Sequence, residues 1–252
     1  MADGARVRTV LDTGAGRDGL VRRLVEVPAG SQFAGTAGPG GELWFVIAGH
    51  GRLSPGAGPA RPVRPDTGLW LPPGAGYRVS ADGPGALTLD AVWLPAGSAG
   101  QTAAGAPEQG GTGAPEQDGT GPPGPGGGPA ETTAPRLAEL ADCPVEVTGD
   151  RRFRVLFGPG NGCSAATQFV GEIPPGRAPE HSHPYDEVVL VLAGEGVLHA
   201  GSGDRPLAPG SCVHLPPGEP HCLENTGRAT LRVLGVFHPG GSPASKQQAP
   251  AS

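Results

Sequence analysis

The stretch that decides the fold is GRAPEHSHPYDEVVLVLAG, residues 176–194. His181 and His183 are separated by one residue, and on a β-strand two residues at that spacing point to the same face. Glu187 follows at the same parity, so the three side chains converge on one point. The valines that come next at this parity extend the face as an apolar wall. The pattern predicts a strand with polar ligands at one end and core residues along the rest.

A second segment, GSCVHLPPGEPHCLEN at residues 210–225, places His221 just after a turn rich in Pro and Gly. The turn brings the chain back across the barrel and carries His221 toward the other three side chains. Three imidazoles and one carboxylate form a ligand set of borderline softness, which suits Fe(II), Mn(II), Ni(II), Co(II) or Zn(II). One or two coordination positions stay open for water, dioxygen or substrate. Surface His-x-His pairs are common, but two patterns in this order favour a metal site.

The composition favours an all-β chain. Among 252 residues there are 46 Gly and 31 Pro, the two poorest helix formers, and 37% of residues are hydrophobic. Short blocks of Val and aromatic residues alternate with turn residues, which is typical of antiparallel strands in a sandwich or barrel. Only residues 136–141 have the pattern of a short helix.

The two halves of the chain share a plan. Each carries Pro-x-Gly, then Glu and Gly with six residues between them, then Pro-Pro-Gly; these stand at residues 28–30, 42–49 and 72–74, and again at 174–176, 187–194 and 216–218. The repeated order predicts a duplicated barrel. We expect one barrel at residues 1–95, a second at 136–240 and a disordered tail at 241–252.

The segment between the halves, residues 96–135, lacks large apolar residues and contains the tandem octapeptide GAPEQGGT–GAPEQDGT. Such a composition buries too little surface to offset the entropy of ordering the backbone. We interpret it as a flexible, disordered Gly/Pro-rich linker; the alternative is a peptide docking motif.

Both quoted segments resemble the paired motifs of the cupin family. Residues 176–194 resemble G-x5-HxH-x3,4-E-x6-G, with four residues instead of five between Gly176 and His181. Residues 210–225 resemble G-x5-P-x-G-x2-H-x3-N without departure. The resemblance implies two jelly-roll barrels of the double-stranded β-helix type. It also implies that one divalent transition metal, with Fe(II) or Mn(II) favoured, is held by four ligands: His181, His183, Glu187 and His221.

The first half resembles the same fold without the metal site. Residues 36–41 stand where His-x-His is expected, and Tyr77 replaces the histidine of the second motif. Glu42 keeps its spacing to Gly49, but one carboxylate without imidazoles does not hold a transition metal at useful affinity. We expect this half to be structural, packing against its twin or shaping a shared pocket.

Five residues near the site in sequence are candidates for lining a substrate pocket: Gln168, Arg177, Tyr185, His199 and His214. The alternative for each is a strand or loop residue that faces solvent or a neighbour. An anionic substrate would require an arginine in the barrel, for which the candidates are Arg177 and Arg232.

The resemblance leaves the reaction open, because a fold does not determine chemistry. The first hypothesis is a dioxygenase or other oxygenase, an Fe(II)- or Mn(II)-dependent oxidoreductase whose small substrate chelates the metal. The second is a non-redox metal-dependent isomerase, epimerase or lyase. The third is a cupin that binds a small molecule without catalysis. A homodimer is compatible with each.

The net charge and the hydropathy of the chain argue against nucleic acid as a partner and against a membrane-spanning segment. The formal net charge is -6 and no basic stripe is present, so no nucleic acid partner is expected. The longest apolar runs, residues 43–48 and 188–193, are too short to cross a bilayer. Four cysteines without CxxC spacing are expected to be reduced thiols. We therefore expect a cytoplasmic protein that acts on a small, anionic molecule.

Overall fold

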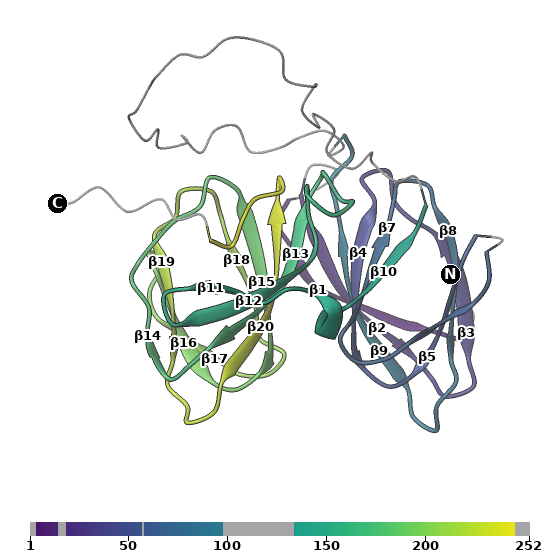
Figure 1. Cartoon of the computed structure of the whole chain (residues 1–252), viewed down its shortest axis with the longest axis horizontal. Coiled ribbons are helices and arrows are strands. Elements are labelled where there is room, and N and C mark those ends of the chain that lie inside the picture. Colours follow the sequence, from purple (N-terminus) through teal and green to yellow (C-terminus); the bar gives the residue numbers. More distant parts are fainter. Residues whose placement is uncertain (1–3, 15–18, 57, 98–133, 245–252) are drawn as a thin grey trace, which may run out of the picture.

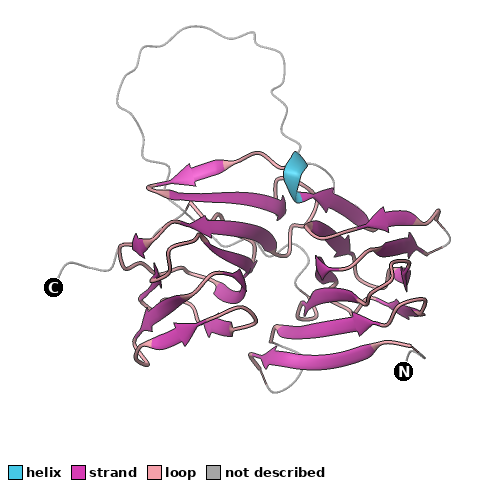
Figure 2. Cartoon of the chain, turned by 90° about the horizontal axis from the view of Figure 1, so that it is seen from below, coloured by secondary structure: helices cyan, strands magenta, loops and turns pink. Residues whose placement is uncertain are grey.

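The computed structural model of the chain describes residues 4–14, 19–56, 58–97 and 134–244. These residues form two β-barrels that lie side by side (Figure 1). Strands account for almost all of the regular structure, as the view from below shows (Figure 2). The prediction of an all-β chain with two barrels is confirmed. Most of the predicted linker, residues 98–133, lies outside the described residues.

The first barrel is built from strands β1 to β9. Their bounds are β1 (Arg6–Asp12), β2 (Val21–Val27), β3 (Gln32–Thr36), β4 (Glu42–Ala48), β5 (Gly51–Pro55), β6 (Arg61–Val63), β7 (Thr67–Leu71), β8 (Gly76–Ala81) and β9 (Leu87–Trp93). One sheet has the order β1-β2-β9-β4-β7 and the other β3-β8-β5-β6.

The second barrel repeats this arrangement. Its strands are β11 (Glu146–Thr148), β12 (Arg151–Phe157), β13 (Thr167–Ile173), β14 (Gly176–Arg177), β15 (Asp186–Ala193), β16 (Gly196–Ala200), β17 (Arg205–Leu207), β18 (Cys212–Leu215), β19 (His221–Asn225) and β20 (Leu231–His238). One sheet has the order β11-β12-β13-β20-β15-β18 and the other β14-β19-β16-β17.

The duplication extends to backbone irregularities. β4 shifts register against β9 between Val46 and Ala48, and β15 shifts register against β20 between Val191 and Ala193. In both barrels the shift is followed by a glycine with a φ of 84°, a left-handed conformation that other residues rarely adopt. A Cβ on Gly49 would also stand 2.3 Å from the Ala86 carbonyl oxygen. The spacing from Glu to Gly in the sequence therefore marks a shared bulge and turn.

The chain re-enters the first barrel after the linker. β10 (Arg136–Glu139) pairs antiparallel with β7 and becomes the edge of the first barrel's sheet, and a single 3-10 turn, η1 (Leu140–Asp142), follows. The predicted helix at 136–141 is thus wrong for its first four residues, because pairing with an open sheet edge overrides local propensity. Among the described residues no helix is long and apolar enough to cross a membrane.

The tail prediction needs a similar correction. Gly241 and Ser242 fall in the predicted disordered tail, yet both carbonyl oxygens accept hydrogen bonds, from the Thr167 hydroxyl at 2.7 Å and the Tyr185 hydroxyl at 3.0 Å. The tail is therefore held against β13 and against Tyr185, just before β15, up to this point. Residues 245–252 lie outside the described part of the chain.

The barrels are joined by a packed interface between their larger sheets. Its core takes residues from both halves, among them Leu43, Phe45 and Trp70 from the first barrel and Val188, Leu234 and Val236 from the second. One ion pair is buried at this interface. Arg22 on β2 donates to Asp90 on β9 at 2.8 Å and 3.1 Å, and also to the Leu234 carbonyl oxygen on β20 at 3.2 Å.

This ion pair should be costly to break on one side only. Asp90→Ala leaves the fully buried Arg22 guanidinium uncompensated, and we expect it to lower the free energy of unfolding by about 3–5 kcal/mol. The double variant Arg22→Met/Asp90→Leu should lose much less. The exposed pair of Arg6 and Glu26 is the control, since Glu26→Ala should cost about 1 kcal/mol or less. Denaturant melts of the variants measure these differences; equal losses for Asp90→Ala and Glu26→Ala would contradict the interpretation.

Candidate metal centre

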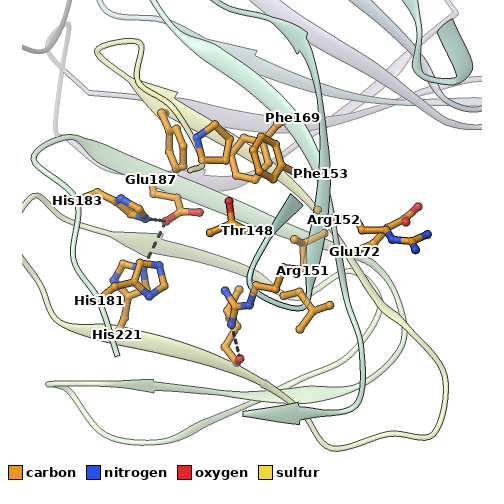
Figure 3. A pocket seen from close by; sticks show the side chains of 16 residues that line it. Thr148, Arg151, Arg152, Phe153, Phe169, Glu172, His181, His183, Glu187 and His221 are labelled. Atoms are coloured by element: carbon orange, nitrogen blue, oxygen red, sulfur yellow. Dashed lines mark hydrogen bonds and ion pairs between the residues drawn. The ribbon is translucent and has the colours of Figure 1, made fainter. Parts of the chain in front are cut away.

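Two backbone hydrogen bonds bring the predicted ligands together. The His181 N–H donates to the His221 carbonyl oxygen at 3.0 Å, and the His221 N–H donates back to the His181 carbonyl oxygen at 2.8 Å. The Gly218 N–H, in the turn before His221, donates to the His183 carbonyl oxygen at 2.7 Å. These bonds seat the loop before β15 on the start of β19. Glu187 is the second residue of β15 and faces the same space (Figure 3).

The distances within the group fit a shared cation. One nitrogen from each of His181, His183 and His221 lies within 4.8 Å of the others, and all three residues are buried. Oε2 of Glu187 stands 3.6 Å from Nε2 of His183 and 3.5 Å from Nε2 of His221. Ligand atoms at about 2.1 Å from one ion, at tetrahedral or octahedral angles, stand roughly 3.0–3.4 Å apart. The two distances from the Glu187 carboxylate to the imidazoles are close to this spacing.

The imidazole orientations are fixed from outside the group. Nδ1 of His181 lies 3.2 Å from the Pro179 carbonyl oxygen, and Nδ1 of His221 lies 2.8 Å from the Glu219 carbonyl oxygen. A carbonyl can only accept, so each Nδ1 carries the proton and each Nε2 is left with a lone pair. His183 is stacked on Tyr185, with ring centroids 5.1 Å apart and planes inclined by 10°. Such fixed tautomers are what a metal site requires.

The electrostatics act in opposite directions on two of the imidazoles, lowering the pKa of His181 and raising that of His221. Burial, together with the rings of His221 and His183, lowers the pKa of His181 to about 4, so its imidazole is neutral at pH 7. Burial alone would lower the pKa of His221 as well, but the carboxylate of Glu187 outweighs it and raises that pKa. Without a cation, Glu187 therefore attracts a proton to the site. A divalent ion would take the place of that proton.

A cavity of about 70 Å³ opens beside these ligands. Its lining includes all four of them, together with Thr148, Arg151, Arg152, Phe153, Phe169, Gly171, Glu172, Ile173, Leu223, Val233, Phe237 and Pro243. Arg151 lies on one side and Phe153 and Phe169 on another, with Thr148 between them (Figure 3). Arg152 and Glu172 point away from the histidines (Figure 3). The cavity therefore has one inward cation and a largely apolar remainder.

The five predicted pocket residues do not line this cavity, which corrects the prediction. Gln168 is fully buried and donates to the Trp44 carbonyl oxygen of the first barrel at 3.4 Å. Tyr185 packs behind His183. Arg177 is exposed on β14.

The two histidines of that set are paired elsewhere. His199 lies 2.7 Å from Asp204 and 2.8 Å from Glu224, and His214 lies 2.6 Å from Asp186. Strand alternation is the physical reason. Gln168, His199 and His214 each neighbour an inward residue in sequence, so their own side chains point out of the barrel.

The arginine expectation is also corrected. Arg232 makes an ion pair with Asp66 of the first barrel at 2.8 Å, while the arginine that faces the ligands is Arg151. Alternation in β12 offers the signal that finds it, because Arg151 and Phe153 share a parity and Phe153 is buried. The aromatic residues of the cavity come from three separate strands, so no local sequence motif predicts that they lie together.

The first barrel has other side chains at the equivalent place. Glu42 accepts hydrogen bonds from the Gly38 N–H at 2.9 Å and from Nε1 of Trp44 at 2.7 Å. Trp44 packs edge-to-face on Tyr77 and stacked on Phe33, with centroids 4.9 Å and 6.0 Å apart. Burial raises the pKa of Glu42. The carboxylate is thus occupied by internal donors, and aromatic rings fill the space next to it.

Comparison with known families and proteins supports the reading of the second half. The sequence model of a family described as "Cupin domain" matches residues 169–237. An oxalate-binding protein from Thermotoga maritima is 37% identical over 68 residues, which cover 26% of this chain and 56% of that relative. The match thus spans only about half the length of that relative.

Solved structures resemble the whole chain in fold. A cupin 2 conserved barrel domain protein from Leptotrichia buccalis is 14% identical, with 94% of this chain and 90% of that one covered at a TM-score of 0.57. Oxalate decarboxylase from Bacillus subtilis, a protein with Mn(II) centres, is 16% identical, with 96% of this chain and 75% of that one covered at a TM-score of 0.67. At these identities the likeness concerns the fold alone.

The assignment of four ligands in the second barrel predicts one metal equivalent per chain. His181→Ala, His183→Ala and His221→Ala should each lower metal affinity by more than the 10- to 100-fold typical of losing an outer-shell partner. Glu42→Gln and Tyr77→Phe, the matched changes in the first barrel, should leave metal content alone. Elemental analysis of the purified variants measures this. Two tightly bound equivalents in the unchanged chain would contradict it.

Proposed function

This chain is a cupin protein of two barrels, and we propose that its second barrel binds one divalent transition metal and holds a small carboxylate substrate on it. His181, His183, Glu187 and His221 are the proposed ligands. Mn(II) or Fe(II) suits this mixed nitrogen and oxygen set, with Ni(II), Co(II) and Zn(II) as alternatives. When bound, the metal supplies a Lewis acid with open coordination positions.

One observation carries the substrate part of the proposal, the guanidinium of Arg151 beside the ligand group. Its terminal nitrogen donates to the Leu223 carbonyl oxygen at 3.0 Å, while Nε is buried and has no hydrogen-bond partner among the described residues. Burial lowers the pKa of Arg151, against the opposing charges of Cys222, Asp150 and Glu187. A desolvated cation with an unused donor favours an anionic ligand.

Charge balance supports the same ligand class. A divalent ion, the Glu187 carboxylate and the Arg151 guanidinium sum to two positive charges in a cavity whose walls are mostly apolar. A carboxylate that spans the metal and Arg151 would neutralise part of this charge. The cavity of about 70 Å³ favours a substrate with few non-hydrogen atoms over a large aromatic one.

The lining supports an oxygenase as the first candidate reaction. An isomerase or lyase requires a group that takes up or delivers a proton at the substrate. Among the described lining residues the carboxylates are Glu187, a proposed ligand, and Glu172, which points away (Figure 3). Three phenylalanines exclude water from the substrate side, and exclusion of water protects reactive oxygen chemistry.

Binding without turnover is the second candidate. The named relative, an oxalate-binding protein that is 37% identical over 68 residues, supports it. The same scarcity of proton-transferring groups is compatible with a protein that only holds its ligand.

Oxalate is the simplest probe of the carboxylate site. Arg151→Gln should weaken oxalate binding to the Mn(II)-loaded protein by about 10- to 100-fold, as expected for loss of a hydrogen bond to a charged group. Arg152→Gln is the matched control, since its side chain points away, and should change affinity by less than about twofold. Titration calorimetry with metal content measured in parallel tests this. Equal effects of the two variants would remove Arg151 from the site.

Oxygen dependence separates the reactions. For any chelating acid that the Fe(II)-loaded protein consumes, we expect turnover in air and none in an anaerobic chamber or with Zn(II). Undiminished anaerobic turnover with Zn(II) would favour the isomerase or lyase hypothesis. Tight binding without turnover under all conditions would favour the hypothesis of a protein that binds its ligand without catalysis.

A further inference from the structure

The cavity beside the proposed ligands has a continuous aromatic wall. Phe237 packs on His183 with ring centroids 5.2 Å apart, and Phe169 packs on Phe237 at 4.7 Å. Phe153 joins the same cluster, and all three phenylalanines are at least 94% buried. The wall starts at a proposed metal ligand, His183, and its Phe153 and Phe169 lie on another side of the cavity from Arg151 (Figure 3). A ligand held by the metal therefore has apolar surface on the side remote from its carboxylate.

One glycine seats this wall and another leaves room in the cavity beside it. Gly235 lies under Phe169, since a Cβ there would stand 2.2 Å from the ring, so the ring is seated against bare backbone. Gly171 lines the cavity between Phe169 and Ile173, and its φ is not in the left-handed region. A Cβ at Gly171 would meet Val233 at 3.1 Å and Phe169 at 3.8 Å. The backbone conformation does not require glycine at this position, and its lack of a side chain leaves room in the cavity.

Thr148 apart, the remaining walls of the cavity, as far as the structure describes them, have no inward polar side chain that could pair with a second charged group. Ile173, Leu223 and Val233 complete the apolar lining, and Arg152 points outward. A charged group placed among these side chains would lose its hydration without gaining a hydrogen bond, which is costly. An alkyl group placed there would bury apolar surface, at a gain of roughly fourfold in affinity for each methyl or methylene.

Building on the proposed carboxylate site, we infer that the substrate is a 2-oxo- or 2-hydroxy-monocarboxylic acid with a short branched alkyl body. The carboxylate and its neighbouring oxygen chelate the metal and contact Arg151. The alkyl body occupies the space between Gly171 and the phenylalanines. Oxalate fits the chelating part of the site and leaves this apolar space unused.

A series of 2-oxo acids with one constant head tests this inference. Pyruvate, 2-oxobutanoate and 3-methyl-2-oxobutanoate differ by one carbon at each step. Calorimetry with the Mn(II)-loaded full chain should show affinity rising roughly fourfold per step. Gly171→Ala should reduce the whole gain from first to last acid to less than about twofold, while pyruvate binding stays within twofold of the unchanged chain.

Enlarging the cavity gives a second measurement, in case Gly171→Ala folds poorly. Ile173→Ala should retain one metal equivalent and improve the affinity for 4-methyl-2-oxopentanoate relative to pyruvate by at least about threefold over the unchanged chain. The absence of this gain would overturn the inference.

The outcomes also separate the inference from the proposed function. If all three acids bind equally, or oxalate binds more than tenfold tighter than each, the alkyl preference is wrong and the carboxylate site stands. If neither oxalate nor any 2-oxo acid binds the metal-loaded protein, the carboxylate site itself is wrong and the inference falls with it.

Discussion

The candidate centre depends on one pair of backbone hydrogen bonds, between His181 and His221. His181 lies in the loop before β15 and His221 is the first residue of β19, and their mutual N–H to carbonyl bonds hold the two imidazoles near each other without a cation. The side chains then follow from strand geometry. His183 is two residues from His181, Glu187 stands on the paired core strand β15, and the carbonyl oxygens of Pro179 and Glu219 fix the tautomers. Backbone hydrogen bonds therefore preorganise the site. They hold three buried imidazoles and a carboxylate within a few ångströms of one another without a bound cation.

The first barrel has the same architecture but lacks these candidate ligands. Its strand order and bulge match those of the second, but Trp44, Tyr77 and Phe33 pack where the other barrel has a cavity. Burial of these aromatic rings stabilises this part of the first barrel. The carboxylate of Glu42 accepts hydrogen bonds from nearby donors. In the first barrel these rings pack against one another beside Glu42. Its larger sheet packs on that of the second barrel through the interface around Arg22.

The four candidate ligands could be predicted from the sequence because they lie in two short segments with diagnostic spacing, and strand parity alone puts His181, His183 and Glu187 on one face. The structure brings these side chains together, and their role as metal ligands stays a prediction. Sequence reasoning also predicted the two barrels because the repeated Pro, Glu and Gly positions mark bulges and turns. It did not reach Arg151 or the phenylalanine wall, since strands far apart in sequence contribute them and only the pairing β12-β13-β20 brings them together. The prediction of Gln168, His199 and His214 as pocket residues was wrong. They lie near the candidate ligands in sequence, but strand alternation turns their side chains out of the barrel. Sequence reasoning also missed β10, whose four residues have no strong strand pattern and take their conformation from the edge of β7.

β10 has a consequence for the integrity of the molecule. It follows the linker in sequence but completes a sheet of the barrel that precedes the linker. Cleavage of the backbone anywhere between residues 98 and 133 would therefore not set two barrels free. The downstream fragment would still supply the last strand of the upstream sheet, and the interface core of both barrels would remain buried. The two halves are thus held together by β10 and the interface core. The covalent linker between them mainly raises their effective concentration.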